Sequence, residues 1–258
     1  MRTIRLAVSL GAALLAAALA GCQQAPVTGR SQLILLPDDE AAKMGADAYK
    51  QILKEGKVSK DPDLNRRVRA VGKRIAEVAD DPGYEWEFKV LEDKEPNAFA
   101  LPGGKVGVNS GLFKVAKNDD QLAAVMAHEV AHAIARHSAE RMSRQMMVQT
   151  GLGVAGAVSE TAAANVGLMA QAATLGLILP FTRDQESEAD EIGLLYMAKA
   201  GYDPREAVKL WQNFEDYGGG RPPEFLSTHP SPGTRIDRLN ALMPNAMQVY
   251  KANKGKYG

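Results

Sequence analysis

Three of the four histidines of this 258-residue chain fall within ten residues, in HEVAHAIARH at positions 128 to 137. Each residue of a helix advances by about 100°, so His128 and His132 lie one turn apart on one face and both rings can reach one ion. Glu129 follows the first histidine, and H-E-x-x-H on a helix is the pattern in which two imidazoles bind zinc while the glutamate handles the proton of a zinc-bound water. The pattern is short enough to occur by chance, so other residues must decide whether a metal site exists.

His137 is a less suitable ligand, because it follows His128 by nine residues and lies about half a turn around a continuous helix from it. Astacin-like and matrix proteases carry a glycine and a third histidine where this chain has Ala135 and Ser138. We therefore interpret His137 as a packing or capping residue.

A second stretch, RDQESEADEIGLLY at 183 to 196, offers a better candidate for the third ligand. Glu186, Asp190 and Gly193 stand at i, i+4 and i+7 on one helical face. Two histidines and Glu186 leave a fourth position open for water, as in thermolysin-like catalytic zinc sites. Asp190 can accept the free ring N–H of a zinc histidine, and Gly193 allows the two helices to cross closely. Glu188 and Glu191 are expected to point elsewhere into solvent; the alternative is that the whole cluster is a charged helix face.

Four stretches together resemble zinc metallopeptidase family 48, which includes the CAAX prenyl protease, HtpX, BepA and LoiP. They are NAFALPGGKVGVNSGLF, HEVAHAIARH, ESEAD and STHPSPGTR, in the family's order and approximate spacing, between residues 35 and 243. The resemblance implies one zinc ion per chain bound by His128, His132 and Glu186, with Glu129 as catalytic base and Asp190 as the partner of a zinc histidine. It also implies an α+β fold of the zincin type (gluzincin), mostly helical, with a small mixed β-sheet and an active-site helix. The several membrane spans of some relatives and the C-terminal repeat domain of others are not evident.

Zinc-bound water attacks a peptide carbonyl most readily when the substrate is held extended, and an exposed strand edge can do this through backbone hydrogen bonds. The candidate strand is Asn97, Ala98, Phe99 and Ala100. The alternative is an ordinary hairpin strand with Phe99 in the core.

The loop STHPSPGTR offers two further candidates, His229 and Arg235. Either can donate to the oxyanion of the reaction. If the His229 ring instead reaches the metal, it becomes a fourth ligand and keeps the enzyme latent until the loop moves. A surface loop stiffened by Pro230 and Pro232 is the alternative to both.

Helices are predicted at 37–55, 61–79, 118–147, 184–200 and 204–216, and extended segments at 86–91 and up to Ser110, with a turn at 102–104. Asp61 is the expected N-cap of the second helix, Asn118 with Gln121 that of the third, and Asp203 with Glu206 that of the last, the latter two as capping boxes. The alanine- and glycine-rich stretch 150–182 is interpreted as packed helices or a flap near the site rather than a bilayer span.

The N-terminus has the form of an export signal. Arg2 and Arg5 precede an uncharged run from Leu6 to Ala20, too short to span a bilayer comfortably. The run ends in LAGC, which resembles the lipobox of bacterial lipoproteins, and Cys22 is the only cysteine, which excludes a disulfide within the chain. We expect a signal peptide at 1–21, an acylated and largely unstructured tether at 22–36, and one peptidase domain at 37–258. Gln23 favours the periplasmic face of the outer membrane of a Gram-negative bacterium.

Composition sets broad limits on function. Thirty-one basic residues balance thirty-one acidic ones, so no overall field attracts nucleic acid. We predict a zinc metalloendopeptidase acting on unfolded or damaged envelope proteins, with the outer-membrane assembly machinery as a further partner. The alternative is a lipoprotein that holds unfolded outer-membrane proteins around a structural zinc, with little proteolysis. An exopeptidase would need a binding group for a free chain terminus, and none is evident.

Overall fold

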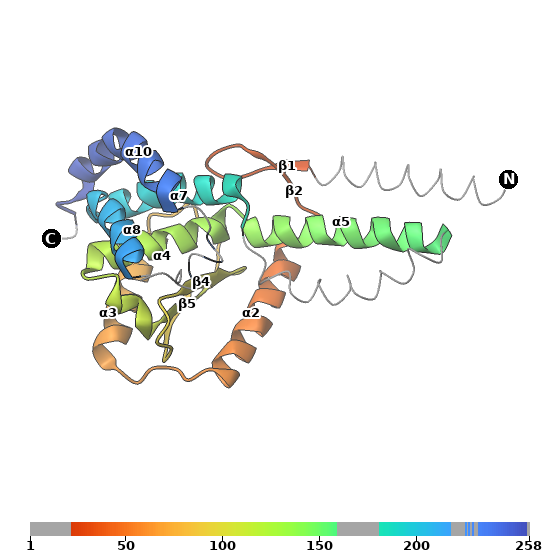
Figure 1. Cartoon of the computed structure of the whole chain (residues 1–258), viewed down its shortest axis with the longest axis horizontal. Helices are drawn as coiled ribbons and strands as arrows, with labels where there is room; N and C mark the ends of the chain where they lie inside the picture. Colours follow the sequence, from red (N-terminus) through yellow and green to blue (C-terminus); the bar gives the residue numbers. More distant parts are fainter. Residues whose placement is uncertain are drawn as a thin grey trace.

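The computed structural model describes residues 22–158, 181–217, 225, 227, 229 and 232–256. In chain order its elements are β1 (Cys22–Gln24), β2 (Ser31–Leu33), α2 (Asp38–Glu55), α3 (Pro62–Ala76), β3 (Glu87–Leu91), β4 (Ala98–Leu101), β5 (Lys105–Asn109), the 3-10 helix η1 (Ser110–Lys114), α4 (Asp119–Ile134), α5 (His137–Val158), α7 (Arg183–Lys199), α8 (Arg205–Tyr217) and α10 (Pro232–Asn253). Helices surround a small sheet, and α5 extends away from the rest (Figure 1). The expected α+β class, mostly helical with a small mixed sheet, is confirmed.

The mixed sheet has the strand order β3-β5-β4. β3 runs parallel to β5, whereas β4 is antiparallel to β5 and lies at the edge. The β4–β5 turn contains Gly103 and Gly104 at φ of 81° and 82°, a left-handed conformation that glycine adopts without steric cost. The predicted turn at 102–104 is therefore confirmed, and it fixes β4 as an edge strand.

α3 forms as its sequence pattern predicts. The Asp61 side chain accepts hydrogen bonds from the backbone N–H groups of Asp63 and Leu64, so Asp61 is the N-cap. Val68 and Ile75 are fully buried on one face, and burying such a side chain contributes about 1.5–3 kcal/mol. The helix ends at Ala76, slightly before the predicted boundary.

α4 carries the histidine motif and is buried along nearly its whole length. The Asn118 side chain caps it by accepting from the Gln121 N–H, but the Gln121 side chain accepts from Lys117 N–H, so the reciprocal capping box is not formed. The prediction of one continuous helix to Met147 is wrong. Helix α4 ends at Ile134, and Arg136 adopts a left-handed φ of 61°, which stops the helix and redirects the chain before α5.

α7 crosses α4 closely, at Gly193. A Cβ atom added to Gly193 would lie 2.9 Å from the backbone nitrogen of His128, closer than real Cβ contacts. The absence of a side chain there allows the two helices that carry the candidate ligands to approach each other. The prediction for Gly193 is confirmed.

α8 begins next to a cap that differs in part from the expected one. Asp203 accepts from the Arg205 N–H, as an N-terminal cap should. Its own N–H donates to Asp120, while the Glu206 carboxylate accepts from the side chains of Asn118 and Gln121. Glu206 therefore ties α8 to the start of α4 and does not close a capping box.

The segment after Cys22 was expected to have no regular structure, and this expectation is wrong. β1 and β2 pair as an antiparallel hairpin, which we call the N-terminal hairpin (residues 22–34). Its exit is fixed to α5, because the backbone N–H of Leu35 donates to the Ser143 hydroxyl at 2.8 Å. The hairpin lies beside α5 in Figure 1.

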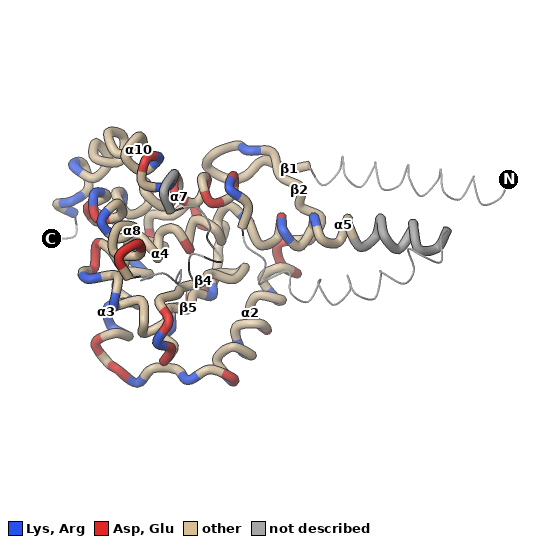
Figure 2. Tube along the Cα trace, in the orientation of Figure 1, with Lys and Arg blue, Asp and Glu red and all other residues tan. Residues whose placement is uncertain are grey.

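Several sequence predictions fall outside the described residues. These are the signal peptide at 1–21 and most of the stretch 150–182, of which only the backbone up to Val158 and the residues from Phe181 are described. In the described parts of the chain, no helix is both long and apolar enough to cross a bilayer. Basic and acidic residues are interspersed along the described parts of the chain, in keeping with the neutral net charge (Figure 2).

Candidate metal centre

Four buried side chains from three parts of the chain converge at the crossing of α4 and α7. His128 and His132 come from α4, Glu186 from the first turn of α7, and His229 from the segment before α10. One ligand atom from each lies within 4.8 Å of all the others. The structure therefore brings together the three predicted ligands and, with them, His229.

Four distances between these atoms are close to those between the ligand atoms of a tetrahedral zinc site. His128 Nε2 lies 3.0 Å from His132 Nε2 and 3.3 Å from His229 Nδ1. Glu186 Oε1 lies 3.3 Å from His132 Nε2 and 2.9 Å from His229 Nδ1. A zinc ion with bonds of about 2.0–2.1 Å holds its tetrahedral ligand atoms about 3.3 Å apart. Imidazole nitrogens and a carboxylate are also the donors that zinc prefers, so these residues fit the ion.

The carboxylate of Asp190 and the guanidinium of Arg235 contact members of the cluster. His128 Nδ1 lies 3.1 Å from Asp190 Oδ1, as the i+4 spacing from Glu186 predicts. Arg235 Nε donates to Asp190 at 2.7 Å, and its Nη2 contacts Glu186. The Arg235 guanidinium also stacks on Trp211, 4.1 Å from the ring centre. Arg235 thus compensates two buried carboxylates, and only its Nη1 has no hydrogen-bond partner among the described residues.

Glu129 is buried beside the cluster without being one of its four members. Burial raises the pKa of its carboxyl, and the nearby His229 and His128 rings oppose that rise. For Glu186, burial also raises the pKa, but His229 and the hydrogen bonds from His128 and His132 outweigh it and lower the pKa overall. The surroundings therefore raise the pKa of Glu129 and lower that of Glu186.

The predicted substrate strand corresponds to β4 and the residue before it. The Asn109 N–H donates to the Asn97 carbonyl, so by alternation Asn97 and Phe99 direct their backbone groups toward β5. Ala98 and Ala100 direct theirs away from it, and no other described strand pairs with that edge. The Ala98 N–H is taken by the Asn97 side chain, and the backbone of Ala100 lies near the Glu129 carboxylate and lowers its pKa. Phe99 is half-buried and covers Gly107, so its ring belongs to the surface of the sheet and not to the main core.

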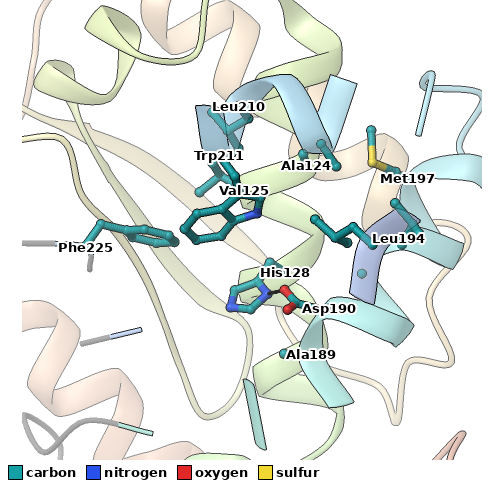
Figure 3. Close-up of a pocket in the computed structure, with 13 residues that line it drawn as sticks. Ala124, Val125, His128, Ala189, Asp190, Leu194, Met197, Leu210, Trp211 and Phe225 are labelled. Carbon is teal, nitrogen blue, oxygen red and sulfur yellow. Dashed lines mark ion pairs between the residues drawn. The ribbon is translucent and has the colours of Figure 1, made fainter. Parts of the chain in front are cut away.

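His229 is held by aromatic rings on both sides. Phe225 stacks on it at 4.4 Å between ring centres, and Phe181 lies 5.4 Å away. Phe225 itself packs against Trp211 and Phe214 of α8. Figure 3 shows Trp211 and Phe225 pointing into a pocket beside His128 and Asp190. The sequence did not predict this aromatic packing, because it depends on how Phe225 and His229 lie against α8.

The structure contradicts the expectation that Glu188 is solvated. Glu188 is buried and accepts a hydrogen bond from His137 Nε2 at 3.0 Å, whereas Glu191 is exposed as predicted. His137 is not among the four metal-site residues, but its Nδ1 lies 2.8 Å from Nδ1 of His132. The contact between His132 and His137 depends on the break between α4 and α5 at Arg136. The sequence contains no signal that predicts this break.

Comparisons with known proteins place the chain in a family. Residues 62–243 match the model of peptidase family M48. The chain is 38% identical over 230 residues to the mitochondrial metalloendopeptidase OMA1 of Schizosaccharomyces pombe, covering 86% of this chain and 66% of that one. It is 35% identical to OMA1 of Saccharomyces cerevisiae, covering 88% of this chain and 71% of that one. It is 32% identical to the beta-barrel assembly-enhancing protease of Escherichia coli, covering 86% of this chain and 48% of that one.

The fold and the buried histidine–glutamate cluster define a metallopeptidase class of protein. The chain belongs to peptidase family M48, and the predicted resemblance is confirmed. It spans about two thirds of the length of the two OMA1 relatives and about half that of the bacterial one.

Proposed function

We propose that this chain is a zinc-dependent endopeptidase that cleaves unfolded or damaged envelope proteins. The observation that carries the proposal is the buried cluster of His128, His132, Glu186 and His229 with the Glu129 carboxylate beside it. His128, His132 and Glu186 would hold one zinc ion, and Asp190 and Arg235 would keep His128 and Glu186 in place. A zinc ion held there supplies acidity to a water molecule and polarises the scissile carbonyl.

Glu129 carries the proton in this proposal. Its carboxylate takes a proton from the attacking water and returns it to the leaving amine. The backbone of β4 holds the substrate extended, with the carbonyl of Ala98 and the edge at Ala100 as the groups that face away from β5. Backbone contacts tolerate many side chains, which suits a protease for unfolded chains. If Arg235 stabilises the oxyanion, the donor is its Nη1, because its Nε and Nη2 already contact carboxylates.

His229 acts as a latch in this proposal. Its Nδ1 is within the ligand cluster and its Nε2 lies 3.4 Å from Glu129 Oε1, so one ring occupies both the fourth ligand position and the neighbourhood of the base. Movement of this segment would open both positions at once. The donor role to the oxyanion then requires the ring to withdraw from the cluster.

The proposed setting is the periplasmic face of the outer membrane, with the chain anchored through an acylated Cys22. The exposed position of Cys22 is compatible with acylation. The name of the bacterial relatives, beta-barrel assembly-enhancing protease, supports envelope proteins as substrates and the assembly machinery as a partner. The proposed domain division remains a signal peptide at 1–21, an anchored segment from 22 and the peptidase domain from 37.

A second function has one observation in its favour. Four protein ligands are typical of structural zinc sites, and His229 provides the fourth. The chain would then be a holding protein for unfolded outer-membrane proteins with little proteolysis. The buried Glu129 argues against this reading, because a structural site needs no proton carrier.

Glu129→Gln distinguishes the two functions. The variant should retain one equivalent of zinc and the wild-type unfolding temperature but lose casein cleavage, since it removes a proton carrier and no ligand. Glu191→Gln, an exposed glutamate on α7, is the matched control and should cleave normally. Full cleavage by Glu129→Gln would favour the holding function, and wild-type protein with less than about half an equivalent of zinc would refute the metal site.

A further inference from the structure

A buried polar network lies next to the metal centre but contains none of its four ligands. Its members are His137 and Glu140 of α5 and Gln185 and Glu188 of α7, all nearly inaccessible to solvent. Arg30 of the N-terminal hairpin joins them. Burying so many polar groups is costly unless each is paired, and here each of the five has a partner.

The hydrogen bonds form one ordered path that begins at a metal ligand. His132 presents Nε2 to the cluster, so the proton of its neutral ring is on Nδ1. That N–H donates to Nδ1 of His137 over 2.8 Å. His137 therefore carries its own proton on Nε2 and donates it to Glu188 Oε2 over 3.0 Å. One assignment of protons satisfies every step, and it ends on a carboxylate.

The N-terminal hairpin fixes the far end of this path. The Thr28 hydroxyl donates to Glu188 Oε1, and Arg30 Nε donates to Oε2 at 2.5 Å. The remaining nitrogens of Arg30 contact both oxygens of Glu140, at 3.1 and 2.8 Å. Gln185 donates to the same carboxylate at 2.8 Å, which ties α7 to α5. Glu188 thus accepts three hydrogen bonds from two elements, the N-terminal hairpin and α5.

We propose that His137 and Glu188 are positioning residues for the zinc ligand His132, and that Thr28 and Arg30 of the N-terminal hairpin complete this support. The inference rests on the proposed metal site. A histidine ligand whose second nitrogen is bonded to a fixed acceptor keeps its tautomer and ring orientation and binds metal more strongly. At His128 the carboxylate of Asp190 lies directly beside Nδ1, 3.1 Å away, whereas His132 reaches its carboxylate through a second imidazole.

The arrangement gives Thr28 and Arg30 of the N-terminal hairpin a part in positioning a metal ligand. Residues about 100 positions away in sequence from His132 determine how firmly that ring is held, although they touch no ligand. The hairpin therefore has a role beyond connecting the peptidase domain to its proposed anchor.

The test measures zinc affinity, by competition with a chromogenic chelator, in the full-length wild type and in His137→Ala, His137→Asn, Glu188→Gln and Arg30→Lys. Loss of such an outer hydrogen bond typically weakens metal binding by about 10–100-fold, and we expect this for His137→Ala and Glu188→Gln. His137→Asn offers an amide oxygen near the position of Nδ1 and should recover most of the affinity. Arg30→Lys, which keeps the charge but loses the fork that joins Glu188 to Glu140, should show a smaller loss.

Two further measurements separate positioning from packing. The visible spectrum of the Co²⁺-substituted protein should change in His137→Ala and return toward wild type in His137→Asn. Gln24→Ala is the matched control on the same hairpin, because Gln24 is exposed and is not one of the residues that hold Glu188 or Arg136. It should retain zinc affinity within about twofold.

The inference is overturned if His137→Ala and Glu188→Gln both bind zinc as wild type does. It is also overturned if their loss equals that of Gln24→Ala, or if it follows the unfolding temperature of the chelator-treated proteins with no recovery in His137→Asn. A wild-type chain that binds no zinc would instead refute the proposed function, so the two failures are distinguishable.

Discussion

Replacing Gly193 with alanine tests whether the close crossing of α4 and α7 builds the metal site. The new Cβ would lie 2.9 Å from His128 N, 3.0 Å from His128 Cα and 3.1 Å from the carbonyl carbon of Ala127. All three are backbone atoms of α4 and cannot rotate away. Ordinary contact begins at 3.4 Å, so the helices must separate locally by 3.4 − 2.9 = 0.5 Å.

This separation exceeds the tolerance of a metal site. Ligand distances in such sites are held within about 0.2 Å, so a shift of 0.5 Å between His128 and Glu186 should weaken zinc binding at least about tenfold. Overpacking costs about 1–3 kcal/mol, and replacing glycine by alanine within a helix returns about 1 kcal/mol. The net cost of about 1 kcal/mol lowers the unfolding temperature of a domain of this size by about 2–4 °C.

Two assays on one preparation check the result: chelator competition for zinc affinity and thermal unfolding with and without chelator. Gly255→Ala, where an added Cβ meets nothing within 4 Å, is the control. A Gly193→Ala variant that binds zinc like wild type and unfolds at a higher temperature would refute the reasoning. The higher helix propensity of alanine would then outweigh any cost of crowding between α4 and α7.

Three other predictions concern the latch, the anchor and the buried network. His229→Ala should raise turnover of a peptide substrate if the latch is correct, whereas a loss of about 10²–10³-fold with unchanged zinc content would support the oxyanion role. Cys22→Ser should no longer sediment with membranes after a carbonate wash; retention would mean that another segment, such as 150–182, is inserted. Burial raises the pKa of Glu140, but Arg30 and Gln185 lower it overall, so its stabilising contribution is present above the ordinary carboxyl pKa and lost as pH falls through the folded value. The difference in free energy of unfolding between wild type and Glu140→Gln, measured with urea, should therefore shrink in acid, and a constant difference would contradict it.

The parts of the site that follow helical periodicity could be predicted from the sequence. His128 and His132 share a face because they are four residues apart, and Glu186 and Asp190 share one for the same reason. Gly193 was predictable as a crossing point because it extends that face by one turn. Each of these inferences needs only the local geometry of one helix, which the capping residues and apolar pattern had already indicated.

The parts that depend on non-helical backbone could not be predicted. Arg136 is a good helix former between two helix-compatible stretches, and neither glycine nor proline marks the break. The N-terminal hairpin contains Pro26 and Gly29, which indicate a turn but not the surface against which the hairpin packs. Glu188 was assigned to solvent because on an isolated α7 it points away from Glu186, and only the position of His137 shows what it meets.

The break at Arg136 explains why Nδ1 of His132 contacts the ring of His137, whereas Nδ1 of His128 lies beside Asp190. On an uninterrupted helix, His137 would be rotated by about 140° from His132 and could not face its Nδ1. A left-handed arginine costs about 1–2 kcal/mol, and such strain persists where surrounding contacts hold it. Here those contacts are Gln23 and Asp38, both from the N-terminal part of the chain. The N-terminal hairpin thus contacts Glu188 through Thr28 and Arg30, and it contacts Arg136 through Gln23. It therefore supports both ends of the hydrogen-bond path from His132 to Glu188.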